Sequence, residues 1–174
     1  NHYPFTTKQL HVGHFTHRRV PHQLVDTPGL LDRPMSDRNA IEMQAIAAIE
    51  HVGSLCIFLM DISESCGTSL DDQHNLLDEV KSLLPEIDII VVVSKADLME
   101  PLPVNWDEVK QSESEWDGEG EPFLPILMDE EGCVTISATE NVGVTSLRLE
   151  MARRCKENSK SDAMTLPEGW HRKD

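Results

Sequence analysis

Three short polar clusters each follow an apolar run, and their residue types could recognise a nucleotide. The clusters are Asp26-Thr27-Pro28-Gly29, Ser94-Lys95-Ala96-Asp97 and Ser137-Ala138-Thr139. The carboxylate of Asp97 can accept two hydrogen bonds, from the N1–H and the exocyclic amine of guanine, and adenine has no matching donors. Leaving a buried acceptor unpaired costs about 1–3 kcal/mol, so this site would discriminate between the two bases. The aliphatic stem of Lys95 can lie along the base plane. The backbone N–H groups of Ser137 and Ala138 could meet the guanine O6.

A second set of residues, near the start of the sequence, could hold phosphate and a metal ion. Gly29 has no Cβ, so its backbone N–H can approach a terminal phosphate. Asp26 can hold Mg²⁺ through water, and the hydroxyl of Thr7 suits the same ion beside phosphates. Loss of the terminal phosphate would release Thr7 and Gly29, which would make an order–disorder switch. Taken alone, residues 26–29 are more typical of an ordinary turn, because Asp starts turns and Pro-Gly forms them.

Apolar runs that alternate with amphipathic stretches predict an α/β domain with a mostly parallel sheet. The expected buried strands are 54–61, 88–97 and 133–139. The expected helices are 38–50, one that begins at Ser69, 106–111 and 144–157. Two further strands, 9–15 and 22–26, are expected to form a hairpin. Ligands of such sheets bind at the carboxyl ends of the strands. All three polar clusters fall there, which is the main argument that they act together.

The charge of the chain is strongly acidic and uneven. The net charge is −16, and residues 107–131 contain ten acidic residues against one base, Lys110. Such a surface should repel a nucleic-acid backbone, so no DNA partner is expected and any grip on RNA should come from elsewhere. Residues 99–131 are expected to form an acidic insertion, which is mobile beyond the short helix 106–111, and residues 156–174 a polar tail or linker. No apolar run reaches the length of a membrane span, and the four cysteines form no CxxC pair, which is typical of reduced thiols.

Five stretches of the sequence resemble the Obg-type branch of the P-loop GTPases and, within it, the Nog subfamily of nucleolar GTP-binding proteins. They are YPFTTKQLHVGHF (3–15), VDTPGLLDRPMSDRNAIEMQAIAAIEH (25–51), MDISESCGTSLDDQ (60–73), SKADL (94–98) and ISATENVGV (136–144). The resemblance implies a partial Ras-like GTPase domain over residues 1–155, with helices on both faces of the sheet and without its first strand and P-loop.

The resemblance also implies a role for each candidate residue. Thr7 and Gly29 would be catalytic, and Thr7 and Asp26 would hold Mg²⁺. The nucleotide-binding residues would be Asp26, Thr27, Pro28, Gly29, Ser94, Lys95, Asp97, Ser137 and Ala138. The ligand would be GTP or GDP, with K⁺ as a further candidate cofactor.

At the level of the whole protein, the resemblance implies a GTP-binding and GTP-hydrolysing switch in biogenesis of the large ribosomal subunit. Its partner would be the pre-ribosomal particle, with its rRNA and assembly factors, bound mainly through regions outside this chain. A nucleolar or nuclear location is expected in a eukaryote, and a cytoplasmic one in an archaeon. Neither a membrane nor DNA is expected as a partner.

Three departures from the family pattern leave alternatives open. The sequence contains no GxxxxGK[ST] loop, so this chain by itself is expected to bind phosphate weakly and to be inactive as a GTPase. Ser94 replaces the usual Asn, which should weaken the affinity for nucleotide. Leu30 stands where many GTPases place a water-orienting Gln, so hydrolysis should be slow and should need K⁺ or a partner. The alternative is a nucleotide-independent scaffold built on a degenerate GTPase domain.

A weaker alternative is a His-rich metal module. His11, His14 and His17 recur every three residues. On a strand this spacing puts neighbouring members on opposite faces, so a zinc site with three of these ligands fits poorly.

Overall fold

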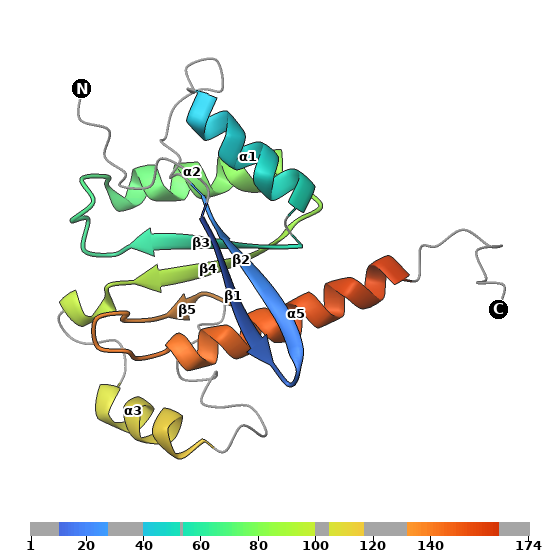
Figure 1. Cartoon of the computed structure of the whole chain (residues 1–174). Helices are drawn as coiled ribbons and strands as arrows, with labels where there is room; N and C mark the ends of the chain where they lie inside the picture. Colours follow the sequence, from blue (N-terminus) through green and yellow to red (C-terminus); the bar gives the residue numbers. More distant parts are fainter. Residues whose placement is uncertain (1–10, 28–39, 53, 100–104, 117–131, 164–174) are drawn as a thin grey trace, which may run out of the picture.

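A computed structural model of the chain describes residues 11–27, 40–52, 54–99, 105–116 and 132–163. The elements in chain order are β1 (His11–His17), β2 (Val20–Asp26), α1 (Ala40–Val52), β3 (Leu55–Asp61), α2 (Leu70–Leu83), β4 (Asp88–Ser94), the 3₁₀ helix η2 (Ala96–Leu98), α3 (Trp106–Glu115), β5 (Val134–Thr135) and α5 (Val144–Ala163). Figure 1 shows how they are arranged. None of the described helices is long and apolar enough to cross a membrane.

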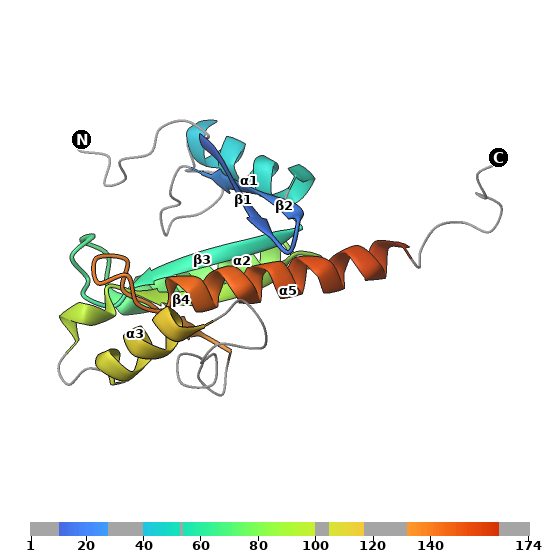
Figure 2. The ribbon, with the colours of Figure 1, turned by 60° about the horizontal axis from the view of Figure 1, so that its bottom comes forward.

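The centre of the fold is a three-stranded parallel sheet in the order β3-β4-β5. Successive residues of a strand point to opposite faces, and the two hydrophobic clusters follow this alternation. Ile90 and Val92 of β4 pack with Leu147 and Met151 of α5, whereas Ile89 lies with the buried face of α2 on the other side. The sheet therefore has helices on both faces, as Figures 1 and 2 show, and the predicted α/β fold class is confirmed.

Most of the expected helices are found where the sequence places them. Ser69 is the N-cap of α2, and its side chain accepts a hydrogen bond from Asp72 N, as its resemblance to a capping box predicts. The helix expected over 38–50 is described as α1, and the one expected over 144–157 continues to residue 163 as α5.

The helix α3 shows that part of the expected acidic insertion belongs to the core. Asn105 caps it by accepting a hydrogen bond from Glu108 N at 3.4 Å, as expected, but the helix runs to residue 115 rather than 111. Its apolar residues Trp106 and Val109 are buried with Ala96 and Val142. Residues 112–115 therefore continue the expected helix, and residues 117–131, most of the segment expected to be mobile, lie outside the described part.

The strand expected over 133–139 is much shorter in the structure. Only Val134 and Thr135 pair with β4 in the ladder, although Ile136 N still donates to Val93 O at 2.9 Å. The chain then folds back, because Ser137 pairs with Val142 in an isolated antiparallel bridge. The residues after Ile136 thus form a closed loop rather than a longer strand.

The β1–β2 hairpin forms a separate two-stranded antiparallel sheet. Its turn contains only Arg18 and Arg19, both with positive φ, instead of the six-residue connector expected from the sequence. A two-residue turn with positive φ at both positions matches the right-handed twist of the strands. The hairpin packs on the sheet layer through Phe15, which contacts the cluster on the α5 face.

Candidate functional site

The carboxyl ends of β4 and β5 bring two of the three predicted clusters into contact. Ser137 Oγ donates a 2.6 Å hydrogen bond to Asp97 Oδ1, across forty residues of sequence. The backbone reinforces this contact, since Ala96 N donates to Ile136 O at 3.2 Å. Within the described part of the chain, no hydrogen bond reaches the second carboxylate oxygen of Asp97. The carboxylate is therefore held at one oxygen and available at the other.

The loop after β5 is closed by its own backbone. Ser137 N donates to Val142 O at 3.0 Å, and Val142 N returns a bond of 2.9 Å to Ser137 O. Glu140 N donates to Ser137 Oγ at 3.1 Å. The N–H of Ser137, which the sequence suggested for the guanine O6, is thus already engaged, while Ala138 beside it is exposed. Ser137 instead orients Asp97 through its hydroxyl.

The helix α3 holds this loop through hydrogen bonds and an ion pair, and the sequence alone did not predict these contacts. Glu113 accepts hydrogen bonds from Gly143 N at 3.2 Å and from Ser146 N and Oγ at 3.2 and 3.0 Å. These N–H groups belong to the first turn of α5 and the residue before it, where a carboxylate is favoured. Lys110 pairs with Glu140 at 2.8 Å. No local sequence signal points to these partners, because each lies about thirty residues away from the other.

Lys95 of the predicted guanine motif is held at the end of β3. Its backbone is left-handed, with φ 58°, and its Nζ lies 2.6 Å from Asp61 Oδ2 and 2.5 Å from Ser65 Oγ. Ser94 Oγ donates to Met60 O at 2.8 Å and so ties β4 to β3. Sequence reasoning did not select Asp61. Its signal in the sequence is an acid that ends an apolar run, as at Asp26.

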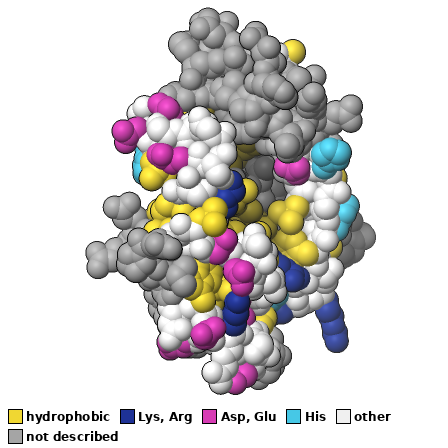
Figure 3. Space-filling model, turned by 90° about the vertical axis from the view of Figure 1, so that its left-hand side faces the viewer, with side chains coloured by type: hydrophobic (Ala, Val, Ile, Leu, Met, Phe, Trp, Pro, Cys, Tyr) yellow, Lys and Arg dark blue, Asp and Glu magenta, His cyan; other side chains and the backbone are white. Residues whose placement is uncertain are grey.

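Figure 3 looks onto the surface toward which β3 and β4 point. Hydrophobic side chains gather in a band across its middle, with acidic and basic side chains beside them. This mixture differs from a uniformly basic groove of the kind that would bind a nucleic-acid backbone.

The phosphate and metal residues predicted from the sequence are described only in part. Asp26 ends β2 and is exposed, and Thr27 follows it half-buried. Thr7, Pro28, Gly29 and Leu30 lie outside the described residues. Among the residues that are described, no group of three or more His, Cys, Asp or Glu side chains is arranged to hold a metal ion.

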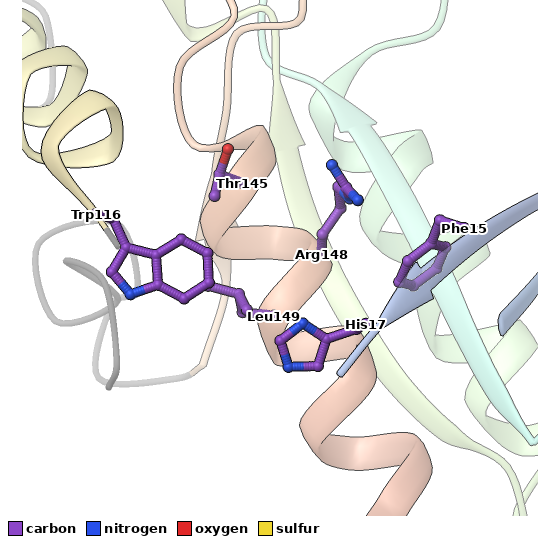
Figure 4. A pocket seen from close by; sticks show the side chains of 6 residues that line it. All are labelled: Phe15, His17, Trp116, Thr145, Arg148 and Leu149. Carbon is purple, nitrogen blue, oxygen red and sulfur yellow. The ribbon is translucent and has the colours of Figure 1, made fainter. Parts of the chain in front are cut away.

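A small pocket lies elsewhere, between β1 and α5. It has a volume of about 80 Å³ and is lined by Phe15, His17, Trp116, Thr145, Arg148 and Leu149. Figure 4 shows Phe15 and His17 reaching from β1 toward α5, where the guanidinium carbon of Arg148 lies 5.5 Å from the Phe15 ring centroid. Ligand sites usually measure about 300–1,000 Å³, and none of the residues predicted to bind the nucleotide lines this pocket. It is packing space between the hairpin and α5.

Comparisons with known proteins point to one family. A family model described as nucleolar GTP-binding protein 1 matches residues 40–97. The chain is 35% identical over 161 residues to nucleolar GTP-binding protein 1 of Kluyveromyces lactis, which covers 92% of this chain and 24% of that protein. It is 44% identical over 99 residues to the protein of the same name from Drosophila melanogaster, covering 57% of this chain and 15% of that protein.

A solved structure gives the same result for the fold. The chain superposes with a TM-score of 0.63 on a crystal structure described as a nucleolar GTP-binding protein 1 from Plasmodium falciparum. The two are 29% identical, and the match covers 89% of this chain and 74% of that one. The chain spans about a quarter or less of the length of the curated relatives named above.

Proposed function

Because the chain belongs to the family of nucleolar GTP-binding protein 1, whose fold is that of the P-loop GTPases, we propose that it recognises guanine nucleotides at the carboxyl ends of β4 and β5. The observation that carries the proposal is the 2.6 Å hydrogen bond from Ser137 Oγ to Asp97 Oδ1. It joins the two loops that must contact the same base. The eukaryotic relatives are named as nucleolar proteins, which supports a location in the nucleolus or nucleus.

The chemistry of recognition follows from what each group can still bond. A carboxylate oxygen has two lone pairs, so Asp97 can accept from the N1–H and the exocyclic amine of guanine while it keeps its bond from Ser137. The stem of Lys95 would lie along one face of the base, and its side chain is 44% exposed. The N–H of Ala138 would donate to O6. Adenine presents an acceptor at N1 and would give the Asp97 carboxylate no donor from the base.

The phosphate end of the nucleotide belongs to the residues before α1. Asp26 is an exposed carboxylate at a strand end, which is a suitable ligand for Mg²⁺ directly or through water. Thr7 would share that ion, which when bound neutralises phosphate charge. Thr27 and Pro28 would shape the turn that brings the Gly29 N–H to the terminal phosphate, as the resemblance to GTPases implies. Hydrolysis would release Thr7 and Gly29 and so switch the protein between two states.

We further propose that this switch acts in assembly of the large ribosomal subunit. The nucleolar names of the relatives support it. The net charge of −16 disfavours a direct grip on RNA by this chain, so contacts with the pre-ribosomal particle would come mainly from the rest of the protein.

One observation favours the second candidate, a scaffold that does not use nucleotide. The hydroxyl of Ser94, which stands where GTPases usually carry Asn, is already bonded to Met60 O. A hydroxyl bonded in this way stabilises the pairing of β3 with β4 and is not directed to a ligand.

Nucleotide binding by the full-length protein separates the two candidates. We expect the wild type to bind GTP at least about tenfold more tightly than ATP. The Asp97→Asn variant should lose GTP affinity and gain affinity for xanthosine triphosphate, because an amide can donate to the xanthine O2 while it accepts from N1–H. Equal affinity of the wild type for GTP and ATP would support the scaffold instead. Titration of the fluorescence of labelled nucleotides measures all of these affinities.

A further inference from the structure

Asp61, the last residue of β3, is a buried acid fixed by more than one element. It is 8% exposed. Its backbone is bracketed by the side chain of Gln73 of α2, which accepts from Asp61 N at 2.7 Å and donates to Asp61 O at 3.1 Å. The same amide donates to Thr68 O at 3.0 Å. The position of Asp61 is thus set by β3 and α2 together.

The carboxylate of Asp61 is enclosed by hydrogen-bond donors of the following loop. Oδ1 accepts from Ser63 N at 3.0 Å and from Ser63 Oγ at 2.6 Å. Oδ2 accepts from Cys66 N at 2.9 Å, from Ser65 Oγ at 3.1 Å and from Lys95 Nζ at 2.6 Å. Burial alone would raise the pKa of Asp61, but the bonds from Lys95, Ser63, Cys66 and Ser65 outweigh it and hold that pKa well below its usual range. The group is therefore an anion at neutral pH.

Lys95 is the one donor in this set that lies outside the loop after β3, since it directly follows β4. Its left-handed backbone is a conformation that non-glycine residues adopt at a cost. Its ammonium has three N–H donors, of which two are directed to Asp61 and Ser65. The Lys95 side chain as a whole is 44% exposed, and it follows the same end of β4 as Asp97. The ammonium is anchored while the stem remains available.

We propose that Asp61 is a positioning residue for guanine-nucleotide binding, because it anchors the Lys95 ammonium so that the stem of Lys95 is already extended where the base binds. This inference rests on the proposed function. Asp61 itself does not touch the nucleotide. A lysine side chain that is free to rotate loses conformational freedom when it binds, and anchoring it beforehand removes that loss.

A double-mutant cycle in the full-length protein tests the proposal. Asp61→Asn should weaken GTP binding by about tenfold, and Lys95→Met by at least as much. In the Lys95→Met background, Asp61→Asn should change the affinity by less than about twofold. Additive losses would overturn the proposal, because Asp61 would then act without Lys95. Failure of the wild type to bind GTP would instead overturn the proposed function.

A second readout separates positioning of Lys95 from general damage to the site. Inosine triphosphate lacks the exocyclic amine of GTP, so the ratio of the two affinities reports on Asp97. Because Lys95 contacts the face of the base, Asp61→Asn and Lys95→Met should leave this ratio unchanged, whereas Asp97→Asn should bring it toward one. A change of the ratio in Asp61→Asn would mean that the whole loop arrangement has moved.

Two serine variants keep the test valid if Asp61→Asn fails to fold. Ser63→Ala and Ser65→Ala each remove one hydroxyl that bonds Asp61, but only Ser65 also contacts Lys95. Ser65→Ala should weaken GTP binding about threefold, an effect that Lys95→Met should abolish, and Ser63→Ala should leave it nearly unchanged. Equal losses in the two variants would overturn the proposal.

Discussion

The carboxyl edge of the β3–β4–β5 sheet and the β1–β2 hairpin are held together in different ways. At the sheet edge, Ser137 bonds to Asp97 and Lys95 to Asp61, each across more than thirty residues of sequence. The hairpin is held by its own ladder, and it reaches the sheet layer through the packing of Phe15. Its Val12 and Val20 are more than half exposed. The proposed guanine end of the site is therefore held by hydrogen bonds between residues distant in sequence. At the phosphate end, Asp26 is placed by the ladder of its own hairpin.

This difference predicts how the two regions respond to change. A substitution at the sheet edge should propagate into several elements, because a residue such as Asp61 has partners on α2, on the loop after β3 and directly after β4. A substitution in the hairpin should stay within the hairpin. Three stability experiments test this comparison, and they are taken in order of the expected effect.

The largest loss of stability is expected for Gly143→Ala. Gly143 lies between the loop after β5 and α5. Gly143 has φ +75°, and a Cβ there would lie 2.6 Å from Thr135 O. The strained backbone and the clash with a strand carbonyl should together cost about 3 kcal/mol of unfolding free energy. Urea denaturation measures the loss.

Gly67→Ala is the matched control for this variant. Gly67 has a similar φ of +83°, but nothing lies within 4 Å of the added Cβ. Only the cost of the left-handed backbone remains, so the loss of unfolding free energy should be about 1 kcal/mol. Equal losses in the two variants would mean that the contact of the added methyl group with Thr135 O does not destabilise the fold. The sheet edge could then shift more easily than its hydrogen bonds indicate.

The second effect concerns Glu150 on α5, which is 1% exposed and accepts hydrogen bonds from Arg153 and Arg154. Arg154 also pairs with Asp88 at the start of β4, so Glu150 helps to tie α5 to the sheet. Glu150→Gln should cost about 2 kcal/mol at pH 7, since a buried partner of two cations is lost but Arg153 can be solvated. Glu157→Gln is the control, because Glu157 also bonds Arg153 but is exposed, and it should cost less than about 0.5 kcal/mol.

The same residue gives a pH dependence with a definite sign. The bonds from Arg153, and then those from Arg154, lower the pKa of Glu150 below its ordinary value of 4.5 despite burial. Because the folded pKa is the lower one, the stabilisation is complete above pH 4.5 and is lost as the pH falls through the folded value. The pKa of Asp61 is also lowered, from its ordinary value of 3.8, so its contribution to stability is likewise lost on acidification. Denaturation between pH 7 and pH 3 should show a steeper loss in the wild type than in Glu150→Gln, and parallel curves would contradict this assignment.

Sequence reasoning was sufficient where a residue's role depends on its neighbours in sequence. Periodicity placed α2 and α5, and the polar residues Ser69 and Asn105 predicted the starts of α2 and α3. It was also sufficient to place Asp97 and Ser137 at adjacent strand ends, because parallel strands bring their carboxyl ends to one edge of the sheet.

It failed where the partner is remote. Nothing near Glu113 indicates that it bonds the first turn of α5, and nothing near Asp61 indicates Lys95. The end of β5 was missed for a related reason. Residues 133–139 have the apolar and β-branched composition of a strand, but Ser137 pairs with Val142 instead of continuing along β4. Local propensity cannot decide between two such pairings.

The smallest effect is expected in the hairpin, whose turn was also not predicted, because Arg18 and Arg19 lack the Asn-Gly signature of such turns. Replacing them by Asn and Gly should stabilise the hairpin by about 0.5–1 kcal/mol, since both positions have positive φ. Amide hydrogen exchange is the right measurement, because it reports each strand separately. Exchange should slow for the amides of β1 and β2 and stay unchanged in β4, to which the hairpin has no ladder bond. Equal slowing in β4 would mean that the hairpin and the sheet open as one unit, so that the contact through Phe15 couples the two ends of the proposed nucleotide site.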